Sequence, residues 1–145
     1  MKTTPLLVLA AAMFGSAIVL AAADSAPPAI PQWHGQYGGS PTLTTEVLRT
    51  TEQWNGFWKQ VERDAPRPFD PLKEMAVAIF IGQRPTGGYV PIILSAGVDK
   101  EGFVVVYDEG APGPDKFVTQ ALTTPWVVAV VPLSDRPVVF QAKAK

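Results

Sequence analysis

Met75-Ala76-Val77-Ala78-Ile79-Phe80-Ile81 is an unbroken apolar run in the middle of the chain, and it ends at Gly82. Such a run is typical of a strand buried on both faces, because neither of its alternating sets of side chains is polar. Asp99-Lys100-Glu101-Gly102 has the composition of a hairpin turn between two further strands. We expect strands over 46–49, 75–81, 89–98, 103–107, 126–131 and 138–140.

One segment has a strong helix pattern, beginning at Thr51. Thr50 and Gln53 have capping-box spacing, and apolar residues follow at helical intervals at Trp54, Phe57, Trp58 and Val61. We expect this stripe to pack on the core and the helix to end near Asp64, although two tryptophans at this spacing also suit a sugar-stacking face. The fold class is therefore mainly β (α+β), an antiparallel sheet or small β-sandwich with one packed amphipathic helix.

The N-terminus has the pattern of an export signal. Lys2 precedes an apolar run from Leu6 to Leu20, and Ala21-Ala22-Ala23 has the small-residue form of a cleavage site. We expect cleavage after Ala23, which gives a periplasmic or secreted protein with no stable membrane insertion; an uncleaved anchor helix is the alternative. Residues 24–32 are interpreted as a proline-rich linker, and residues 33–145 as one domain.

Composition argues against several classes of function. The chain has 12 basic and 13 acidic side chains without a basic cluster, so nothing supports nucleic-acid binding. It has no cysteine and only one histidine, His34, which disfavours a metal site or a Ser-His-Asp triad. Asp108 and Glu109 directly follow the predicted strand 103–107, and in an extended chain adjacent side chains point to opposite faces. They are therefore poor candidates for a cooperating acid/base pair. We expect a non-enzymatic protein without metal or cofactor.

The loop Arg84-Pro85-Thr86-Gly87-Gly88-Tyr89 joins two predicted strands. Pro85 fixes one φ angle, and the two glycines allow backbone angles closed to other residues. The loop carries no nucleophile, base or metal ligand. It is interpreted as a preformed surface that grips another molecule.

A second long segment, residues 110–125, contains Pro112, Gly113 and further prolines. Loops of this length without secondary structure are uncommon in small domains unless they are functional or disordered. It ends at Thr124-Pro125-Trp126, where the rigid approach is expected to present an indole as an apolar anchor. The simpler interpretation, which is compatible with a functional one, is a loop that packs on its own Phe117, Val118 and Leu122.

Aromatic residues and glycines are interleaved in Trp33-His34-Gly35-Gln36-Tyr37-Gly38-Gly39. We expect Trp33 and Tyr37 to pack on the domain, with an aromatic glycan platform as the alternative.

Motifs spread over almost the whole predicted domain resemble the PrcB family, whose members are called protease complex subunits. The resemblance implies an exported, non-catalytic protein that associates with a protease and supports its stability or maturation. The family's better-known setting is a membrane-tethered lipoprotein, from which this chain departs because it has no cysteine. The resembling motifs are Trp33-x-Gly35-Gln36, Glu52-x-Trp54-x-x-x-Trp58, Lys73-Glu74-Met75, Gly82-Gln83-x-Pro85-Thr86-Gly87-Gly88-Tyr89, Pro112-Gly113-Pro114 and Thr119-Gln120-Ala121-Leu122-Thr123-x-Pro125.

Three segments also show a weaker similarity to the chagasin-type inhibitors of cysteine proteases, which present three loops at one end of an immunoglobulin-like sandwich. The corresponding segments are 84–89, 110–113 and 124–126, although the first lacks the family's Asn and second Thr and the third lacks its Arg. This similarity implies protease inhibition as an alternative function. Glycan binding through Trp33 and Tyr37 is a further alternative.

Our main hypothesis is a protease-binding protein that uses its 84–89 and 110–126 loops. In it, Arg84 supplies charge-assisted hydrogen bonds and Trp126 supplies an apolar anchor. The predicted partner-binding residues are Arg84, Pro85, Thr86, Gly87, Gly88, Tyr89, Pro112, Gly113, Thr124, Pro125 and Trp126.

Overall fold

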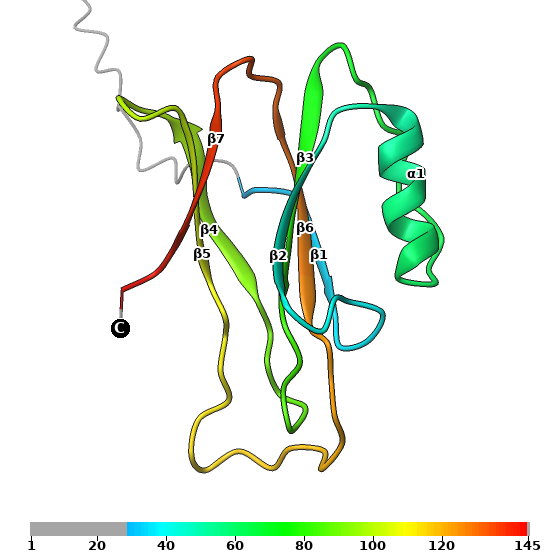
Figure 1. Ribbon diagram of the computed structural model, residues 1–145, viewed down its shortest axis with the longest axis vertical. Coiled ribbons are helices and arrows are strands. Elements are labelled where there is room, and N and C mark those ends of the chain that lie inside the picture. Colours follow the sequence, from blue (N-terminus) through cyan, green and yellow to red (C-terminus); the bar gives the residue numbers. More distant parts are fainter. Residues whose placement is uncertain (1–28, 145) are drawn as a thin grey trace, which may run out of the picture.

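The computed structural model describes residues 29–144, so the predicted signal and most of the linker lie outside the described residues (Figure 1). Within this range, no helix is long and apolar enough to span a membrane. The elements are β1 (Gln32–Gly35), β2 (Leu43–Leu48), α1 (Thr51–Gln60), β3 (Glu74–Ile81), β4 (Ile92–Val98), β5 (Phe103–Asp108), β6 (Trp126–Pro132) and β7 (Val138–Ala142).

The strands form two sheets. One is an antiparallel four-stranded sheet in the order β1-β6-β3-β2, and the other is a three-stranded sheet in the order β4-β5-β7. In the second sheet β4 and β5 are antiparallel, whereas β5 and β7 are parallel. The sheets face each other, and α1 covers the outer face of the four-stranded sheet (Figure 1). The predicted mainly β sandwich with one packed helix is confirmed.

The central strands β3 and β6 have a core on each face. In β3, Ala76, Ala78 and Phe80 contribute to the cluster beneath α1, whereas Met75 and Ile79 contribute to the cluster between the sheets. Residues 75–81 are all buried, which confirms the strand predicted from the apolar run. A strand between two cores must be apolar throughout, because successive side chains enter different cores.

The helix forms as its sequence predicts. Thr50 and Gln53 make the reciprocal capping-box hydrogen bonds, which satisfy backbone donors at the start of α1. Trp54, Phe57 and Trp58 are buried, and Trp33 from β1 packs edge-on against both tryptophans with ring centroids 6.0 Å apart. The stripe is therefore a core face, and the sugar-stacking interpretation of the helix is wrong.

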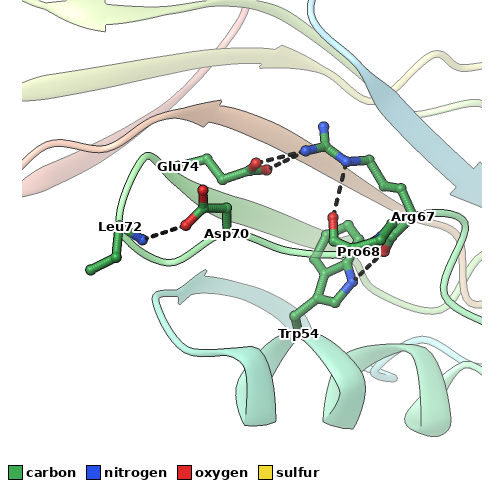
Figure 2. Close-up of polar contacts among 6 residues, drawn as sticks. All are labelled: Trp54, Arg67, Pro68, Asp70, Leu72 and Glu74. Atoms are coloured by element: carbon green, nitrogen blue, oxygen red, sulfur yellow. Dashed lines mark hydrogen bonds and ion pairs between the residues drawn. The ribbon is translucent and has the colours of Figure 1, made fainter.

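The connection from α1 to β3 is held by polar contacts (Figure 2). The Trp54 indole donates a hydrogen bond to the Arg67 carbonyl oxygen at 3.2 Å, and the Arg67 guanidinium donates to both carboxylate oxygens of Glu74 at 2.6 and 2.8 Å. Glu74 is the first residue of β3. This charge-assisted pair, made by a single guanidinium nitrogen of Arg67, links the connection to the sheet.

Several elements differ from the sequence prediction. β2 begins at Leu43 instead of residue 46 and ends at Leu48 instead of residue 49. β1 was not predicted, and it begins inside the expected linker at Gln32. β4 begins at Ile92 instead of residue 89, because Pro91 has no N–H to pair and the Val90 N–H donates to the Gly110 carbonyl oxygen. α1 ends at Gln60, before the predicted end near Asp64.

Replacing Trp58 tests the packing of the helix on the sheet. We expect Trp58→Ala to lower the free energy of unfolding by about 3–5 kcal/mol, the usual cost of deleting a large buried aromatic side chain. Trp58→Phe should cost clearly less, because it keeps a ring in the core and removes a buried indole N–H that has no hydrogen-bond partner within residues 29–144. Urea unfolding followed by circular dichroism measures both; equal losses would contradict this account.

Candidate partner-binding site

Two loops meet at one end of the sandwich (Figure 1). Arg84 and Thr123 exchange backbone hydrogen bonds of 2.8 and 2.9 Å, and the Gly87 N–H donates to the Thr119 carbonyl oxygen at 2.9 Å. The Val90 N–H completes the set by bonding to the Gly110 carbonyl oxygen at 3.0 Å. Residues 84–90 and 110–123 therefore form one unit, called the double loop below.

Close packing reinforces these bonds. The buried Thr123 hydroxyl donates to the Thr86 carbonyl oxygen at 2.8 Å. Gly88 has a φ of 91°, and a Cβ atom there would lie 2.6 Å from Cγ1 of Val118 and 3.0 Å from Cβ of Pro112. Glycine is required at position 88 both for its backbone angle and for the approach of the second loop.

Arg84 is engaged within the molecule. Its guanidinium pairs with the Glu109 carboxylate at 2.9 Å and lies over the Tyr89 ring, 5.4 Å from the ring centre. Glu109 also acts on Tyr107: burial raises the pKa of the Tyr107 phenol, and the negative charge of Glu109 raises it further. The ion pair between Arg84 and Glu109 thus connects the first loop to the residue that follows β5.

The structure corrects the predicted role of Trp126. Its side chain has no exposed surface, its ring packs edge-on against Phe57 and Trp58, and its N–H donates to the Tyr37 carbonyl oxygen at 2.7 Å. Pro125 is also fully buried. Trp126 offers no contact surface, so its interpretation as an apolar anchor for a partner is wrong. It lies in the core at the end of the long loop, and Thr124, Pro125 and Trp126 are called the base of the double loop below.

The exposed apolar side chains of the double loop were missed as candidate contacts. Phe117 is completely exposed, and Leu122 is 64% exposed. The predicted self-packing is therefore wrong for these two residues, whereas Val118 is half-buried and lies close to Gly88. The sequence signal for a contact residue was Phe117 itself, an aromatic residue within a long loop stiffened by prolines. A loop has no periodicity that would show whether its side chain is buried or exposed.

The remaining predicted residues differ in exposure. Pro85 and Gly113 are exposed at the loop surface, and Gly87 is buried. The half-buried ones are Thr86, Tyr89, Pro112 and Thr124. Within residues 29–144, no group of three or more His, Asp or Glu side chains is placed to hold a metal ion. Chemically, the double loop offers apolar side chains on a hydrogen-bonded backbone frame.

The requirement for glycine at position 88 is testable within the same loop pair. We expect Gly88→Val to destabilise the protein by at least about 1–2 kcal/mol, since a side chain is strained at positive φ and collides with Val118. Gly113→Val is the matched control, because a Cβ there meets only the Lys116 side chain at 3.8 Å. Thermal melting compares them, and equal melting temperatures would show that the loops do not hold each other.

A family model described as PrcB C-terminal matches residues 75–132. The match runs from the second residue of β3 to the last residue of β6, and so it includes both halves of the double loop. Neither a curated protein nor a solved structure matches this chain. The family match confirms the resemblance to the PrcB family over this segment of the chain.

Proposed function

We propose that this chain is a non-catalytic exported protein that binds a protease and supports its stability or maturation through the double loop. The observation that carries the proposal is the exposure of Phe117 and Leu122 on a frame closed by backbone hydrogen bonds. The PrcB match supports a protease as the partner, because members of that family are called protease complex subunits. The matched residues include the whole frame.

The frame lowers the cost of binding. A flexible loop loses conformational entropy when a partner orders it, whereas a loop held by proline and by its neighbour has lost much of that entropy already. The Lys116 N–H donates a hydrogen bond to the Gly113 carbonyl oxygen at 3.1 Å, which closes a turn directly before Phe117. An exposed aromatic side chain on such a loop has the properties of an interface hot spot.

Arg84 contributes to the proposed function by holding the first loop in place. Because its guanidinium already pairs with Glu109 and lies over Tyr89, it holds the first loop in place for contact through Thr86 and the neighbouring backbone. Its predicted charge-assisted bond to the partner remains a hypothesis. That bond would have to form in addition to the internal pair or in its place.

Protease inhibition is a second function for the same surface, favoured by the position of both loops at one end of a sandwich (Figure 1). A protruding loop with an apolar tip is also suited to enter a cleft. Glycan binding has less support, since Trp33 packs against Trp54 and Trp58, which leaves Tyr37 as the exposed aromatic residue of that segment.

Capture from the native organism tests the proposal. Tagged full-length chain is incubated with the envelope fraction, and bound proteins are identified by mass spectrometry. We expect a protease to be enriched, and Phe117→Ala to reduce its capture at least about tenfold, as truncation of a hot-spot aromatic does. The matched control is Leu72→Ala, since Leu72 is 85% exposed before β3, away from the double loop.

The activity of the captured protease separates the two functions. Activity that persists in the complex agrees with a stabilising subunit, whereas loss of activity assigns the chain to the inhibitors. Equal melting temperatures of the variants are the control for folding. If no protease is enriched, or if Phe117→Ala and Leu122→Ala both capture it as well as the unaltered chain, the proposed site is wrong.

A further inference from the structure

A second surface, separate from the double loop, lies along the free edge of β4. Among the residues that the structure describes, β4 is the first strand of its sheet and pairs only with β5. The stretch from Val90 to Val98 carries no charged side chain, and Ile92, Leu94 and Val98 are 43%, 46% and 57% exposed. Sheet edges in soluble proteins are protected by charges, prolines, bulges or covering segments, because an open edge recruits other strands; this edge has Pro91 and a register shift at one end but no charge.

One position on this edge already binds an amide group. The Ile93 N–H donates to the Gln32 side-chain oxygen at 2.8 Å, and the Gln32 side-chain nitrogen donates to the Ile93 carbonyl oxygen at 3.1 Å. A neighbouring β-strand makes the same pair of hydrogen bonds to a residue at a sheet edge. Gln32 therefore occupies the position of a peptide group from an added strand.

Two further positions follow from the register. The Asp99 N–H donates to the Gly102 carbonyl oxygen, so Asp99 and Gly102 form a hydrogen-bonded pair of the β4–β5 hairpin. The next pair along the hairpin is Val98 with Phe103, and Ala96 with Val105 follows two residues further on. Since hydrogen-bonded and non-bonded pairs alternate, the backbone groups of Ala96 and Val98 face the free edge. Within residues 29–144, no other element donates to or accepts from them. A register shift between Ile93 and Ser95 separates this pair from Ile93.

The edge lies in a groove. The groove has a volume of about 540 Å³, and no charged residue lines it; Ile30, Gln32, Ile92, Leu94, Ala96 and Pro132 are among the lining residues. A single extended peptide fits such a recess. Residues before and in β1 (Ile30 and Gln32) and the last residue of β6 (Pro132) line the groove beside β4, so we expect a single free peptide to reach the edge more readily than the edge of a second copy does.

We infer that the β4 edge is a strand-addition site for an extended, uncharged and largely apolar segment of a partner polypeptide. The segment pairs its backbone with Ala96 and Val98 and places apolar side chains against the groove. Gln32 competes with it for Ile93. The inference does not depend on the partner being a protease, because the surface and its chemistry differ from those of the double loop.

The experiment pans a displayed library of random peptides on the intact protein and maps an enriched synthetic peptide by amide hydrogen exchange. We expect enriched sequences without charge or proline and rich in Val, Ile and Thr, which favour strands. The bound peptide should protect the amides of Ala96 and Val98. Leu94→Lys should weaken its binding about tenfold or more, whereas Leu43→Lys, at an exposed position of β2, should leave it unchanged.

Gln32→Ala provides a test with the opposite sign. Removing the competing amide frees the N–H and carbonyl oxygen of Ile93, so affinity should rise about three- to tenfold for a peptide long enough to reach them. If Gln32 only stabilises the fold, the variant melts earlier and binds no better, which contradicts its role as competitor. The strand-addition site is wrong if no peptide is enriched, or if the bound peptide protects amides of the double loop instead of β4. It is also wrong if sedimentation shows a dimer that Leu94→Lys dissociates, because the edge would then bind a second copy of the chain.

Discussion

The burial of Trp126 is the interaction on which the rest of the structure depends. Its ring lies against Phe57 and Trp58 of α1, and its N–H bonds to the Tyr37 carbonyl oxygen after β1. Gly35 makes this possible, because a Cβ atom there would lie 2.6 Å from the indole ring. One side chain thus joins the helix, β1 and the first residue of β6. It also terminates the long loop, so the position of the loop is set by the core.

This base explains how the double loop can expose apolar side chains and still be ordered. Thr124 donates its backbone N–H to the Gln36 carbonyl oxygen, and its hydroxyl accepts from the Gly39 N–H. The buried hydroxyl of Thr123 then connects the base to the first loop through the Thr86 carbonyl oxygen. Phe117 takes no part in these bonds, and its side chain is exposed. The bonds that hold the double loop and the side chain proposed as its main contact therefore belong to different residues.

Periodicity predicted those parts of the structure in which burial follows a regular pattern. Residues 75–81 and the stripe from Trp54 to Val61 were identified because a strand between two cores and a one-sided helix leave clear patterns. β1 was missed because Gly35 and the exposed His34 obscure the alternation of apolar and polar residues that marks a strand. Gly35 is required there for close packing against Trp126. The direction in which Trp126 and Phe117 face was beyond sequence reasoning, since each adjoins loop residues and only tertiary contacts decide which one is buried.

Both proposed contact surfaces lie within one segment of the chain. Residues 75–132, which match the PrcB C-terminal model, contain both the double loop and β4 with its open edge. The elements before this segment mainly cover or fix it: α1 covers one face of the sheet, and β1 brings Gly35 to Trp126 and Gln32 to Ile93. Gln32 and Gly35 lie on the same short strand, so β1 both supports the base of the loop and occupies part of the β4 edge. A partner strand that displaced the Gln32 amide would remove one attachment of β1, while β1 kept its pairing with β6 and its contact with Trp126. The edge could therefore be occupied without unfolding the double loop.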